Sequence, residues 1–220
     1  MINYLLNFKN LYLISFLFCI IWDILYIYLL IFLLVSAKFS KGVLSIETIV
    51  IYKSKTGFTK RYAEFITEDL DAEIYELHEI KIEDIDKYDT IIYGGGLYAG
   101  CINGIDFINK NIDILKKHKV IVFATGLCSG SDDEINNMKN SNFNQEQIKD
   151  IDFFYLRGGF NFNNLSIVDK ILMTLMKLKL KFKKNLSNDE KGLLNAYEHP
   201  IDFVDRKNIS KLINSITIKI

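Results

Sequence analysis

Residues 48–59 read TIVIYKSKTGFT, an apolar run that ends in a cluster of small and hydroxyl residues. The run from Thr48 to Tyr52 predicts a buried strand, and Thr59 to Leu70 predicts the helix that follows it. A turn from a strand into a helix leaves N–H groups without partners, which together with hydroxyls suit a phosphate. The stretch therefore predicts a phosphate pocket at the turn. The alternative is an ordinary helix cap made by Thr56 or Thr59.

Two common nucleotide-binding motifs are missing from this turn. It has no Gly-Lys-Ser/Thr of a triphosphate-binding loop, and it lacks the three spaced glycines of a dinucleotide-binding loop. ATP and NAD are therefore poor fits to the pocket.

Beyond the turn, short apolar runs alternate with amphipathic stretches, which is typical of strands and helices around a parallel sheet. The predicted strands are Thr48–Tyr52, Glu73–Leu77, Thr90–Tyr93, Val120–Ala124 and Phe153–Leu156. The predicted helices are Thr59–Leu70, Ile105–Leu115, Asp132–Lys139, Ile167–Lys179 and Asp205–Ser215. This order predicts an α/β domain with a doubly wound, five-stranded parallel sheet over residues 45–220.

Two glycine-containing loops are predicted at the carboxyl ends of neighbouring strands, where open α/β sheets bind their ligands. The first is Gly94-Gly95-Gly96-Leu97-Tyr98-Ala99-Gly100 and the second is Thr125-Gly126-Leu127-Cys128-Ser129-Gly130. Glycines permit close backbone approach and positive φ, and Tyr98 offers an aromatic face. The alternative for the first loop is a glycine-rich turn with a packed tyrosine.

The turn at residues 54–59, Ser-Lys-Thr-Gly-Phe-Thr, resembles the phosphate loop of the flavodoxin family, Ser/Thr-x-Thr-Gly-x-Thr, at every fixed position. The resemblance implies a flavodoxin-like fold that binds FMN and leaves the redox chemistry to the flavin, so that no catalytic side chain is expected. It implies that the phosphate is held by Ser54, Lys55, Thr56, Gly57, Phe58 and Thr59, with Lys55 and Phe58 contributing their N–H groups. It also implies that the flavin ring lies along Gly94, Gly95, Gly96, Leu97, Tyr98 and Ala99, with Thr125, Gly126 and Leu127 at its other edge.

The last third of the chain is similar to the flavodoxin-like, quinone-dependent protoporphyrinogen dehydrogenases. Those proteins place a Gly-Ala/Gly-aromatic segment after the final strand and then an aspartate-containing helix rich in Met, Leu, Ile and Lys. Here residues 157–162 read RGGFNF and residues 168–177 read VDKILMTLMK. Asn163 and Asn164 stand where the family has Tyr-x-x-x-Tyr character. The resemblance implies an oxidoreductase whose redox donor and acceptor include a quinone or a porphyrinogen.

The segment from Ile167 to Lys184 predicts an amphipathic helix. Its apolar face comprises Val168, Ile171, Leu172, Leu175, Met176, Leu178 and Phe182, and lysines at 170, 177, 181 and 184 are expected on the other side. Two interpretations are open. The apolar face covers the sheet, or the helix docks to an anionic membrane surface or an anionic substrate.

The overall charge is balanced, with 27 basic and 27 acidic residues. This balance gives no support for nucleic-acid binding. It also argues against a flavodoxin-type electron carrier without substrate chemistry, because such carriers are usually acidic and dock on basic partners. The carrier is nevertheless the alternative to the oxidoreductase, and a membrane protein with a degenerate flavodoxin domain is a third interpretation.

Residues 1–44 form a hydrophobic N-terminal segment in front of this domain. The stretch from Leu11 to Val35 is apolar except for Ser15 and Asp23, and it is long enough to span a bilayer. As a membrane anchor it would leave a cytoplasmic domain, which Lys38 and Lys41 weakly favour. A signal peptide is one alternative. Another is upstream sequence translated from a start placed too early, with Val43 or Leu44 as the true first residue.

The remaining polar and thiol side chains have simple interpretations. Cys19, Cys101 and Cys128 form no metal-ligand pair or disulfide framework and are interpreted as free thiols, with Cys101 buried and inert. The histidines at 78, 118 and 199 are scattered, so no metal site is expected. The cluster Asp132-Asp133-Glu134 is interpreted as a solvated helix cap.

Overall fold

The structure is a computed structural model that describes residues 25–32 and 47–217, which belong to two compact units divided at Ser45 and Ile46. In the first unit, residues 25–32 form a helix with exposed apolar side chains. Among the residues described, no helix has both the length and the apolar character needed to cross a bilayer. The rest of the predicted anchor, Leu11 to Val35, and the alternative starts at Val43 and Leu44 lie outside the described residues.

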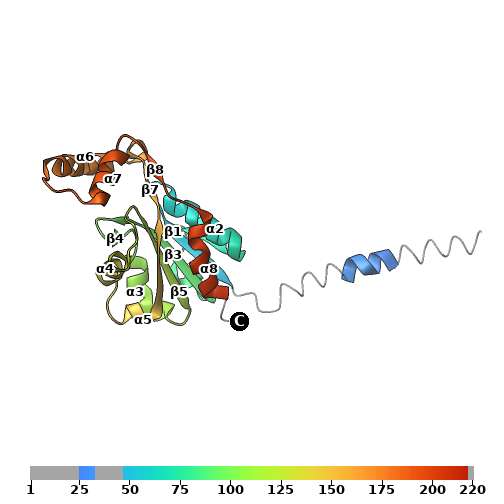
Figure 1. The fold of residues 1–220 in the computed structure, drawn as a ribbon. Coiled ribbons are helices and arrows are strands. Elements are labelled where there is room, and N and C mark those ends of the chain that lie inside the picture. Colours follow the sequence, from blue (N-terminus) through green and yellow to red (C-terminus); the bar gives the residue numbers. More distant parts are fainter. Residues whose placement is uncertain (1–24, 33–46, 218–220) are drawn as a thin grey trace, which may run out of the picture. The chain divides into compact units, whose positions relative to one another are not determined.

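The second unit is built on a sheet whose strands follow the order β2-β1-β3-β5-β6 and are all parallel (Figure 1). A short strand, β4, pairs antiparallel with the end of β3. The strands are β1 (Thr48–Lys53), β2 (Glu73–Glu76), β3 (Thr90–Tyr98), β4 (Cys101–Ile102), β5 (Lys119–Gly126) and β6 (Ile151–Arg157). The five predicted strands and the α/β class with a parallel sheet are confirmed.

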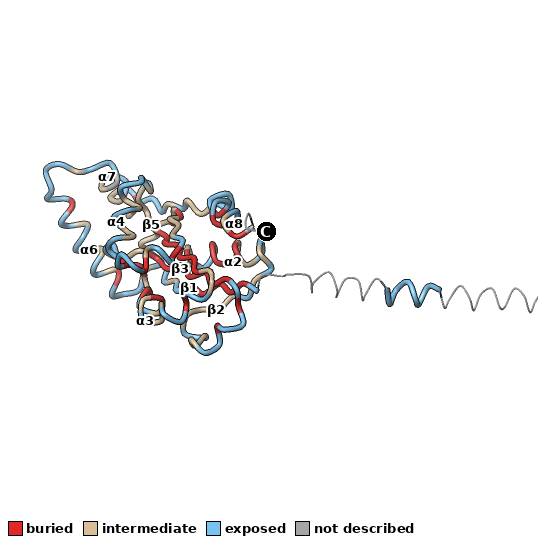
Figure 2. Tube along the Cα trace, turned by 90° about the horizontal axis from the view of Figure 1, so that it is seen from below, coloured by how far each residue is buried: buried red, intermediate tan, exposed pale blue. Residues whose placement is uncertain are grey.

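Helices cover both faces of this sheet, and alternate residues of each strand point to opposite faces. Ile49, Ile51, Tyr93 and Val122 lie on the face covered by α3 (Asp106–Leu115), whereas Val50 and Phe123 lie on the face covered by α2 (Phe58–Leu70) and α8 (Ser210–Thr217). Because both faces are buried, the strands read as continuous apolar runs. Figure 2 shows the buried residues gathered along β1, β3 and β5.

The first predicted glycine loop is mostly strand, so the expectation of a loop from Gly94 onward is wrong. Gly94 and Gly95 continue β3 in register with Tyr52 and Lys53 of β1 and with β5. A Cβ on Gly94 would lie 2.1 Å from the Phe123 Cζ atom, so only glycine lets that ring cross the strand. These glycines serve close packing, and none of them has the positive φ that was expected.

An insertion of several short elements separates β6 from α8. It contains β7 (Gly159–Phe160), a 3-10 turn (Phe162–Asn164), α6 (Ile167–Phe182), α7 (Asn188–Ala196) and β8 (Ile201–Asp202), and β7 pairs antiparallel with β8. Figure 1 shows α6 and α7 side by side, next to the β7–β8 pair. The sequence predicted α6 but not α7 or the β7–β8 pair.

The remaining elements differ from prediction mainly at their ends. The structure has α4 at Asp132–Asn142, a short α5 at Gln147–Asp150 and a 3-10 turn at Ile82–Asp84. The predicted last helix, Asp205–Ser215, is a 3-10 turn (Arg206–Ile209) followed by α8. None of these shifts changes which loops meet at the carboxyl edge of the sheet.

Candidate functional site

The predicted phosphate loop connects β1 to α2, and α2 begins there without a side-chain cap. Its N-cap is Gly57, in the left-handed region with φ 89°, and the first turn contains no acidic residue. By contrast α4, α6 and α7 each begin with a serine whose hydroxyl accepts a backbone N–H bond. The alternative of an ordinary cap by Thr56 or Thr59 is therefore wrong. The N–H groups of the first turn of α2 are left for another partner.

Three segments converge on this loop at Thr59. Its Oγ1 atom lies 2.6 Å from Thr125 Oγ1 at the end of β5, and both residues are buried. A Cβ on Gly96 would lie 3.5 Å from the same Thr59 oxygen. Within the loop, Ser54 Oγ accepts a bond of 3.1 Å from the Gly57 N–H. The structure thus brings together residues from all three predicted site segments.

The tight turn of the second segment lies later than predicted. Ala99 and Gly100, with φ of 50° and 85°, connect β3 to β4. Gly94 and Gly95 are the last residues of β3 that pair with β1, and Gly96 is the glycine of this segment that approaches Thr59. The binding roles of Gly94 to Ala99 stay a prediction.

Tyr98 folds against the phosphate loop. Its ring centroid is 4.5 Å from the Lys55 ammonium, and its hydroxyl bonds to Thr56. Burial, and then the charge of Asp169, raise the pKa of Tyr98, so it stays a neutral phenol. One face of the expected stacking ring is therefore covered by a cation of the same loop.

Asp169 is a site residue that sequence reasoning did not assign. Its Oδ1 atom lies 3.0 Å from the Lys55 ammonium, and its Oδ2 accepts a bond of 2.8 Å from the Ser166 hydroxyl. The Ser166 hydroxyl, followed by the Lys55 ammonium, holds the pKa of Asp169 below its ordinary value. The ion pair ties the start of α6 to the phosphate loop. Residues 55 and 169 are so far apart in the chain that no sequence pattern connects them.

The third segment, Thr125 to Gly130, begins inside β5 and turns at Gly130, where φ is 77°. The Tyr155 hydroxyl donates a bond of 3.0 Å to the Cys128 carbonyl and holds the turn from below. At its end, Glu134 and Ser131 cap α4 reciprocally, and the backbone N–H of Ser131, followed by the Ser129 hydroxyl, keeps the pKa of Glu134 low. The acidic cluster at 132–134 is a helix cap, as predicted. The roles of Thr125, Gly126 and Leu127 toward a flavin stay a prediction.

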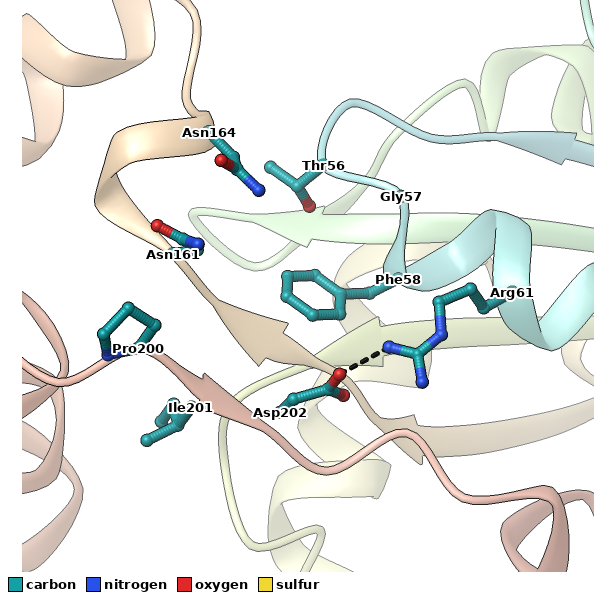
Figure 3. A pocket seen from close by; sticks show the side chains of 9 residues that line it. All are labelled: Thr56, Gly57, Phe58, Arg61, Asn161, Asn164, Pro200, Ile201 and Asp202. Carbon is teal, nitrogen blue, oxygen red and sulfur yellow. Dashed lines mark hydrogen bonds and ion pairs between the residues drawn. The ribbon is translucent and has the colours of Figure 1, made fainter.

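Two cavities border the phosphate loop. The first, of about 270 Å³, is drawn in Figure 3, where Thr56, Gly57 and Phe58 face Asn161 and Asn164 of the insertion, and Arg61 pairs with Asp202. The second, of about 470 Å³, is lined by Lys55 and Tyr98 and by residues of β4 and the start of α3. The loop therefore has open space beside it.

Asn142 positions the β3–β4 turn, and sequence reasoning missed it. This buried side chain accepts a bond of 2.8 Å from the Ile102 N–H and donates bonds to the Gly100 and Met138 carbonyls. It thus connects the end of α4 to the turn beside Tyr98. An asparagine at the end of a polar helix looks like any surface residue in sequence.

Asn142→Ala is expected to destabilise the second unit by about 1–3 kcal/mol, because it leaves the Ile102 N–H buried without an acceptor. Urea unfolding measures the loss, and amide exchange at Ile102 should accelerate selectively. Unchanged exchange at Ile102 would contradict a positioning role. The matched control is Asn140→Ala on the exposed side of the same helix.

The structure also describes two cysteines and the three histidines. Cys101 and Cys128 are free thiols, but Cys101 is exposed rather than buried, since it lies in the β3–β4 turn. His118 bonds through Nδ1 to the Tyr88 carbonyl at 2.6 Å. Within residues 25–32 and 47–217, no cluster of His, Cys, Asp and Glu could hold a metal ion. Cys19 lies outside the described residues.

Comparisons with solved structures found several similar folds. The Trp repressor binding protein of Bacillus subtilis is 17% identical, with 64% of this chain and 100% of that chain covered and a TM-score of 0.40. A flavoprotein in complex with FMN from Lactobacillus acidophilus is 20% identical, with coverages of 51% and 92% and a TM-score of 0.33. Oxidised flavodoxin 2 of Bacillus cereus is 18% identical, with coverages of 62% and 99% and a TM-score of 0.34.

Comparison with curated protein sequences found no match. The family model described as flavodoxin domain, however, matches residues 49–187, which include all three loops at the carboxyl edge of the sheet. Since the matched residues make up more than half of the chain, this protein belongs to the flavodoxin-domain family.

Proposed function

We propose that this protein binds FMN and acts as a flavin-dependent redox protein. The observation that carries the proposal is the uncapped N-terminus of α2, where the loop from Ser54 to Thr59 offers N–H groups and hydroxyls with no carboxylate in the first turn. A phosphate ester suits such a helix terminus. Membership of the flavodoxin-domain family supports FMN as the phosphate ester.

The residues around the loop fit such a group. At Gly57, no atom lies within 4 Å of the position that a Cβ would take, so the loop is open at the helix terminus. Ser54, Thr56 and Thr59 would hold the phosphate together with the N–H groups of Lys55 and Phe58. Thr125, Gly126 and Leu127 would border one edge of the ring.

The β3–β4 segment would border the other edge of the ring. Because β3 pairs with β1 only as far as Gly95, we assign direct contact to Gly96, Leu97, Tyr98 and Ala99. When bound, FMN supplies the transfer of one or two electrons. The chain's own part is to orient the ring, to exclude water through Tyr98 and to place the Lys55 charge near it.

The proposed role is that of an oxidoreductase related to the quinone-dependent protoporphyrinogen dehydrogenases, with a quinone or a porphyrinogen as redox partner. Its support is the sequence resemblance at residues 157–162 and 168–177 together with the balanced charge. An electron carrier without substrate chemistry is the second candidate. One observation favours the carrier: the Lys55 cation over the Tyr98 ring is already paired with Asp169.

The experiment is to purify the full chain, denature it and identify the released flavin. We expect yellow protein that releases FMN and neither FAD nor riboflavin, since the loop is built for a single phosphate ester. Colourless protein that FMN cannot reconstitute would contradict flavin binding. Sustained turnover with a porphyrinogen as donor and a quinone as acceptor would identify the oxidoreductase, whereas a single stoichiometric oxidation of the reduced flavin would identify the carrier.

The boundary at residues 44 and 45 and the anchoring of the domain by residues 11–35 are further parts of this proposal. Both rest on the sequence: an apolar stretch is followed by a domain that starts its first strand at Thr48. The intact mass of the native protein decides between an anchor and a start at Val43 or Leu44.

A further inference from the structure

The insertion helix α6 presents its apolar face outward. Its most exposed side chains are Phe182, at 85%, and Ile167, at 79%, and the same face includes Val168, Ile171, Leu172, Leu175, Met176 and Leu178. Figure 2 shows α6 exposed along nearly its whole length. The interpretation in which this face covers the sheet is therefore wrong. A contiguous exposed apolar surface of this kind marks an interaction site.

A different face of α6 holds the helix to the protein. Asp169, Met173, Lys177 and Leu180 recur at three- and four-residue spacing and point inward. The Tyr197 hydroxyl donates a bond to the Met173 carbonyl, and Leu180 is buried. The Lys177 ammonium lies 4.9 Å from the Tyr197 ring centroid and 3.7 Å from Glu198. Lys177, expected on the outer basic face, is therefore part of the packing against the end of α7.

The charges beside the apolar face are positive.

Results

Sequence analysis

Residues 48–59 read TIVIYKSKTGFT, an apolar run that ends in a cluster of small and hydroxyl residues. The run from Thr48 to Tyr52 predicts a buried strand, and Thr59 to Leu70 predicts the helix that follows it. A turn from a strand into a helix leaves N–H groups without partners, which together with hydroxyls suit a phosphate. The stretch therefore predicts a phosphate pocket at the turn. The alternative is an ordinary helix cap made by Thr56 or Thr59.

Two common nucleotide-binding motifs are missing from this turn. It has no Gly-Lys-Ser/Thr of a triphosphate-binding loop, and it lacks the three spaced glycines of a dinucleotide-binding loop. ATP and NAD are therefore poor fits to the pocket.

Beyond the turn, short apolar runs alternate with amphipathic stretches, which is typical of strands and helices around a parallel sheet. The predicted strands are Thr48–Tyr52, Glu73–Leu77, Thr90–Tyr93, Val120–Ala124 and Phe153–Leu156. The predicted helices are Thr59–Leu70, Ile105–Leu115, Asp132–Lys139, Ile167–Lys179 and Asp205–Ser215. This order predicts an α/β domain with a doubly wound, five-stranded parallel sheet over residues 45–220.

Two glycine-containing loops are predicted at the carboxyl ends of neighbouring strands, where open α/β sheets bind their ligands. The first is Gly94-Gly95-Gly96-Leu97-Tyr98-Ala99-Gly100 and the second is Thr125-Gly126-Leu127-Cys128-Ser129-Gly130. Glycines permit close backbone approach and positive φ, and Tyr98 offers an aromatic face. The alternative for the first loop is a glycine-rich turn with a packed tyrosine.

The turn at residues 54–59, Ser-Lys-Thr-Gly-Phe-Thr, resembles the phosphate loop of the flavodoxin family, Ser/Thr-x-Thr-Gly-x-Thr, at every fixed position. The resemblance implies a flavodoxin-like fold that binds FMN and leaves the redox chemistry to the flavin, so that no catalytic side chain is expected. It implies that the phosphate is held by Ser54, Lys55, Thr56, Gly57, Phe58 and Thr59, with Lys55 and Phe58 contributing their N–H groups. It also implies that the flavin ring lies along Gly94, Gly95, Gly96, Leu97, Tyr98 and Ala99, with Thr125, Gly126 and Leu127 at its other edge.

The last third of the chain is similar to the flavodoxin-like, quinone-dependent protoporphyrinogen dehydrogenases. Those proteins place a Gly-Ala/Gly-aromatic segment after the final strand and then an aspartate-containing helix rich in Met, Leu, Ile and Lys. Here residues 157–162 read RGGFNF and residues 168–177 read VDKILMTLMK. Asn163 and Asn164 stand where the family has Tyr-x-x-x-Tyr character. The resemblance implies an oxidoreductase whose redox donor and acceptor include a quinone or a porphyrinogen.

The segment from Ile167 to Lys184 predicts an amphipathic helix. Its apolar face comprises Val168, Ile171, Leu172, Leu175, Met176, Leu178 and Phe182, with Lys170, Lys177, Lys181 and Lys184 expected on the other side. Two interpretations are open. The apolar face covers the sheet, or the helix docks to an anionic membrane surface or an anionic substrate.

The overall charge is balanced, with 27 basic and 27 acidic residues. This balance gives no support for nucleic-acid binding. It also argues against a flavodoxin-type electron carrier without substrate chemistry, because such carriers are usually acidic and dock on basic partners. The carrier is nevertheless the alternative to the oxidoreductase, and a membrane protein with a degenerate flavodoxin domain is a third interpretation.

Residues 1–44 form a hydrophobic N-terminal segment in front of this domain. The stretch from Leu11 to Val35 is apolar except for Ser15 and Asp23, and it is long enough to span a bilayer. As an anchor in the cell membrane it would leave a cytoplasmic domain, which the lysines that follow it weakly favour. A signal peptide is one alternative. Another is upstream sequence translated from a start placed too early, with Val43 or Leu44 as the true first residue.

The remaining polar and thiol side chains have simple interpretations. Cys19, Cys101 and Cys128 form no metal-ligand pair or disulfide framework and are interpreted as free thiols, with Cys101 buried and inert. The cluster Asp132-Asp133-Glu134 is interpreted as a solvated helix cap. No metal site is expected, because the three histidines are scattered at His78, His118 and His199.

Overall fold

The structure is a computed structural model that describes residues 25–32 and 47–217, which belong to two compact units divided between Ser45 and Ile46. In the first unit, residues 25–32 form a helix with exposed apolar side chains. Among the residues described, no helix has both the length and the apolar character needed to cross a bilayer. The rest of the predicted anchor, Leu11 to Val35, and the alternative starts at Val43 and Leu44 lie outside the described residues.

The second unit is built on a sheet whose main strands follow the order β2-β1-β3-β5-β6 and are all parallel (Figure 1). A short strand, β4, pairs antiparallel with the end of β3. The α/β class and the five predicted strands are confirmed. The strands are β1 (Thr48–Lys53), β2 (Glu73–Glu76), β3 (Thr90–Tyr98), β4 (Cys101–Ile102), β5 (Lys119–Gly126) and β6 (Ile151–Arg157).

Helices cover both faces of this sheet, and alternate residues of each strand point to opposite faces. Ile51 and Val122 lie on the face covered by α3 (Asp106–Leu115). Val50 and Phe123 lie on the face covered by α2 (Phe58–Leu70) and α8 (Ser210–Thr217). Because both faces are buried, the strands read as continuous apolar runs. Figure 2 shows buried residues gathered along β1, β3 and β5.

The first predicted glycine loop is mostly strand, so the expectation of a loop from Gly94 onward is wrong. Gly94 and Gly95 continue β3 in register with Tyr52 and Lys53 of β1. A Cβ on Gly94 would lie 2.1 Å from the Phe123 Cζ atom, so only glycine lets that ring cross the strand. These glycines serve close packing, and none of them has the positive φ that was expected.

A segment of two helices and two short strands, residues 159–202, lies between β6 and the last helix and is called the insertion below. Figure 1 shows its helices α6 and α7 side by side, next to the strand pair β7–β8. The sequence predicted α6 but neither α7 nor the strand pair. In chain order the insertion contains β7 (Gly159–Phe160), a 3-10 turn (Phe162–Asn164), α6 (Ile167–Phe182), α7 (Asn188–Ala196) and β8 (Ile201–Asp202), with β7 and β8 antiparallel.

The remaining elements differ from prediction mainly at their ends. The structure has α4 at Asp132–Asn142, a short α5 at Gln147–Asp150 and a 3-10 turn at Ile82–Asp84. The predicted last helix, Asp205–Ser215, is a 3-10 turn (Arg206–Ile209) followed by α8. None of these shifts changes which loops meet at the carboxyl edge of the sheet.

Candidate functional site

The predicted phosphate loop connects β1 to α2, and α2 begins there without a side-chain cap. Its N-cap is Gly57, in the left-handed region with φ 89°, and the first turn contains no acidic residue. By contrast α4, α6 and α7 each begin with a serine whose hydroxyl accepts a backbone N–H bond. The alternative of an ordinary cap by Thr56 or Thr59 is therefore wrong. The first N–H groups of α2 are open to a ligand.

Three segments converge on this loop at Thr59. Its Oγ1 atom lies 2.6 Å from Thr125 Oγ1 in β5, and both residues are buried. A Cβ on Gly96 would lie 3.5 Å from the same Thr59 oxygen. Within the loop, Ser54 Oγ accepts a bond of 3.1 Å from the Gly57 N–H. The structure thus brings together residues from all three predicted site segments.

The tight turn of the second segment lies later than predicted. Ala99 and Gly100, with φ of 50° and 85°, connect β3 to β4. Gly94 and Gly95 are the last residues of β3 that pair with β1, so the part of this segment that approaches the phosphate loop begins at Gly96. The flavin-binding roles expected for Gly94, Gly95, Gly96, Leu97, Tyr98 and Ala99 stay a prediction.

Tyr98 folds against the phosphate loop. Its ring centroid is 4.5 Å from the Lys55 ammonium, and its hydroxyl is hydrogen-bonded to the Thr56 side chain. Burial, followed by the charge of Asp169, raises the pKa of Tyr98, so that it stays a neutral phenol. One face of the Tyr98 ring, which was expected to stack on a flavin, is therefore covered by the Lys55 ammonium of the phosphate loop.

Asp169 joins the site although sequence reasoning did not assign it. Its Oδ1 atom lies 3.0 Å from the Lys55 ammonium, and its Oδ2 atom accepts a bond of 2.8 Å from the Ser166 hydroxyl. The Ser166 hydroxyl, followed by the Lys55 ammonium, holds the pKa of Asp169 below its ordinary value. The ion pair ties the start of α6 to the phosphate loop. Its partners are 114 residues apart, so no sequence pattern connects them.

The third segment begins inside β5 and turns at Gly130, where φ is 77°. The Tyr155 hydroxyl donates a bond of 3.0 Å to the Cys128 carbonyl and so fixes the turn. At its end Ser131 and Glu134 cap α4 reciprocally, and the Ser131 N–H keeps the pKa of Glu134 low. The acidic cluster is thus a helix cap, as predicted. The roles of Thr125, Gly126 and Leu127 toward a flavin stay a prediction.

Two cavities border the phosphate loop. The first, of about 270 Å³, is drawn in Figure 3, where Thr56 and Phe58 face Asn161 and Asn164 of the insertion. An ion pair between Arg61 and Asp202 closes one side of it. The second cavity, of about 470 Å³, is lined by Lys55 and Tyr98 and by residues around β4 and the start of α3. The loop therefore has open space beside it.

Asn142 positions the β3–β4 turn. This buried side chain accepts a bond of 2.8 Å from the Ile102 N–H and donates bonds to the Gly100 and Met138 carbonyls. It thus connects the end of α4 to the turn beside Tyr98. Sequence reasoning missed it, because an asparagine at the end of a polar helix resembles any surface residue.

Asn142→Ala is expected to destabilise the second unit by about 1–3 kcal/mol, because it leaves the Ile102 N–H buried without an acceptor. Urea unfolding measures the loss, and amide exchange at Ile102 should accelerate selectively. The matched control is Asn140→Ala on the exposed side of the same helix. Unchanged exchange at Ile102 would contradict a positioning role.

The structure also describes two cysteines and the three histidines. Cys101 and Cys128 are free, but Cys101 is exposed rather than buried, since it lies beside the β3–β4 turn. His118 contacts the Tyr88 carbonyl through Nδ1 at 2.6 Å. Within residues 25–32 and 47–217, no cluster of His, Cys, Asp and Glu could hold a metal ion. Cys19 lies outside the described residues.

Comparison with solved structures found several similar folds. The Trp repressor binding protein of Bacillus subtilis is 17% identical, with 64% of this chain and 100% of that chain covered and a TM-score of 0.40. A flavoprotein in complex with FMN from Lactobacillus acidophilus is 20% identical, with coverages of 51% and 92% and a TM-score of 0.33. Oxidised flavodoxin 2 of Bacillus cereus is 18% identical, with coverages of 62% and 99% and a TM-score of 0.34.

Comparison with curated protein sequences found no match. The family model described as flavodoxin domain, however, matches residues 49–187, which include all three loops at the carboxyl edge of the sheet. Since the matched residues make up more than half of the chain, this protein belongs to the flavodoxin-domain family.

Proposed function

We propose that this protein binds FMN and acts as a flavin-dependent redox protein. The observation that carries the proposal is the uncapped N-terminus of α2, where the loop from Ser54 to Thr59 offers N–H groups and hydroxyls with no carboxylate in the first turn. A phosphate ester suits such a helix terminus. Membership of the flavodoxin-domain family supports FMN as that ester.

The residues around the loop fit such a group. At Gly57, no atom lies within 4 Å of the position that a Cβ would take, so the loop is open at the helix terminus. Ser54, Thr56 and Thr59 would hold the phosphate together with the N–H groups of Lys55 and Phe58. One edge of the ring would border Thr125, Gly126 and Leu127.

The β3–β4 segment would border the other edge of the ring. Because β3 pairs with β1 only as far as Gly95, we assign direct contact to the residues from Gly96 to Ala99. When bound, FMN supplies the transfer of one or two electrons. The chain's own part is to orient the ring, to exclude water through Tyr98 and to place the Lys55 charge near it.

The proposed role is that of an oxidoreductase related to the quinone-dependent protoporphyrinogen dehydrogenases, with a quinone or a porphyrinogen as redox partner. Its support is the sequence resemblance at residues 157–162 and 168–177 together with the balanced charge. An electron carrier without substrate chemistry is the second candidate. One observation favours the carrier: Lys55, the cation that lies over the Tyr98 ring, is already paired with Asp169.

The test of flavin binding is to purify the full chain, denature it and identify the released flavin. We expect yellow protein that releases FMN and neither FAD nor riboflavin, since the loop suits a single phosphate ester. Colourless protein that FMN cannot reconstitute would contradict flavin binding. Sustained turnover with a porphyrinogen as donor and a quinone as acceptor would identify the oxidoreductase, whereas a single stoichiometric oxidation of the reduced flavin would identify the carrier.

A boundary between residues 44 and 45 and the anchoring of the domain by residues 11–35 are further parts of this proposal. Both rest on the sequence, in which an apolar stretch precedes a domain whose first strand starts at Thr48. The intact mass of the native protein distinguishes an anchored chain from one that starts at Val43 or Leu44.

A further inference from the structure

The insertion helix α6 presents its apolar face outward. Its most exposed large side chains are Phe182, at 85%, and Ile167, at 79%. Figure 2 shows α6 exposed along nearly its whole length. The interpretation in which this face covers the sheet is therefore wrong. The face comprises Ile167, Val168, Ile171, Leu172, Leu175, Met176, Leu178 and Phe182, and a contiguous exposed apolar surface of this kind marks an interaction site.

A different face of α6 holds the helix to the protein. Asp169, Met173, Lys177 and Leu180 recur at three- and four-residue spacing and are the less exposed positions of the helix. The Tyr197 hydroxyl donates a bond to the Met173 carbonyl. The Lys177 ammonium lies 4.9 Å from the Tyr197 ring centroid and 3.7 Å from a Glu198 oxygen. Lys177, which was expected among the outer lysines, therefore packs against the end of α7.

The charges beside the apolar face are positive. Between Asp169 and Asp189 the sequence has six lysines and no acidic residue. Lys183 is paired with Glu190 at 2.6 Å. Lys179, Lys181 and Lys184 are exposed, and within the part of the chain that the structure describes they form no ion pair. An apolar helix face accompanied by unpaired lysines is the composition of helices that lie in a membrane interface.

We propose that α6 docks on an anionic lipid surface. The apolar side chains would enter the boundary between headgroups and acyl chains, and Lys179, Lys181 and Lys184 would contact lipid phosphates. A second copy of this chain fits poorly, because an isologous contact through this face would bring the same lysines against one another. The complementary surface must be negative and must accept a long apolar stripe, which an anionic leaflet does.

The test is hydrogen exchange on the full chain, read in peptides that cover residues 167–182. The chain is mixed with vesicles of phosphatidylcholine alone, or of equal parts phosphatidylcholine and phosphatidylglycerol. Because the readout is local to α6, attachment through another segment does not mimic it. We expect anionic vesicles to slow exchange in α6 at least about tenfold, and neutral vesicles to change it little. Added salt should weaken the effect.

Two variants separate charge from apolar contact. Lys179→Glu with Lys181→Glu should abolish the slowing, since each lysine near an anionic leaflet contributes about fivefold in affinity. Leu175→Gln should also reduce it without changing FMN content or the unfolding midpoint, because Leu175 is exposed. The matched control is Lys110→Glu with Lys117→Glu, two exposed lysines elsewhere, which should keep the slowing.

Several outcomes would overturn the proposal. Equal slowing by neutral vesicles would show apolar docking without charge recognition. Slow exchange in α6 without vesicles would show that another part of the chain or a second copy covers the face. Exchange in α6 that is slowed by a soluble porphyrin tetracarboxylate but by no vesicle would show that the face binds an anionic small molecule. Exchange that is slowed by an acidic protein but by no vesicle would show that the face binds a protein. FMN content is measured in every variant, so that a failure of flavin binding is distinguishable from a failure of docking.

Discussion

Thr56→Asp is expected to weaken FMN binding at least about 100-fold, which corresponds to about 2.7 kcal/mol. Thr56 lies directly before Gly57, the N-cap of α2. A carboxylate there would take the N–H groups of the first turn and would repel the phosphate, and like charges brought together cost several kcal/mol. Riboflavin lacks the phosphate, so its affinity should change little. Calorimetric titration of the apoprotein with both flavins measures the difference.

The matched control is Thr56→Asn, which removes the same hydroxyl and its hydrogen bond to Tyr98 but adds no charge. It should weaken FMN binding about tenfold, as expected for one hydrogen bond to a charged group. Unfolding of the apoprotein provides a second readout. The aspartate should raise its stability by about 0.3–1 kcal/mol, because a negative charge favours a helix N-terminus. Equal FMN affinities for the two variants would show that the loop does not bind a phosphate.

Phe123→Ala is expected to destabilise the second unit by about 3–5 kcal/mol, the usual cost of removing a buried aromatic ring. The Phe123 side chain is fully buried, at 0% exposure, and crosses the strand at Gly94. Gly94→Ala alone should cost about 1–3 kcal/mol, because its new methyl group would overlap that ring. In the Phe123→Ala background the same methyl group has room, so the second substitution should cost almost nothing.

Urea unfolding of the wild type, the two single variants and the double variant forms a complete cycle. The expected coupling is as large as the cost of Gly94→Ala alone. If the two costs instead add, Gly94 is needed for a reason other than the ring, and a role for its backbone in ligand binding gains support. Phe154→Ala, at a half-buried position of the neighbouring strand β6, is the control that should show no coupling to Gly94.

The order of strands and helices could be predicted because both faces of the sheet are covered. Alternate residues such as Val50 and Ile51 are then both apolar, and each strand appears as a short continuous run. The end of β3 could not be predicted, because glycine is disfavoured in strands. Glycine is needed at position 94 because the Phe123 ring of β5 crosses the strand at that point. The elements β7, β8 and α7 are too short for a periodic pattern to indicate them.

The part of the site that consists of consecutive residues could be predicted from the sequence. The residues from Ser54 to Thr59 are consecutive, so their pattern could be recognised in the sequence. The contact of Thr59 with Thr125 and the ion pair of Lys55 with Asp169 join segments far apart in the chain. For α6, periodicity indicated which residues share a face but not which face packs. That choice depends on Asp169 and Tyr197, whose contacts exist only in the folded chain.

Because α2 has no side-chain cap, the apoprotein is expected to be less stable against unfolding than the FMN-bound protein. A side-chain cap contributes about 0.5–2 kcal/mol to the stability of a helix. Helix α2 has no such cap, and the proposed partner of its first N–H groups is the FMN phosphate. A ligand that binds only the folded chain raises its stability by mass action, by about 2.7 kcal/mol at 100 times its dissociation constant. Chains that have not yet bound FMN would spend more time unfolded and would be degraded first. The cellular amount of this protein would then follow the supply of flavin as much as the rate of its synthesis.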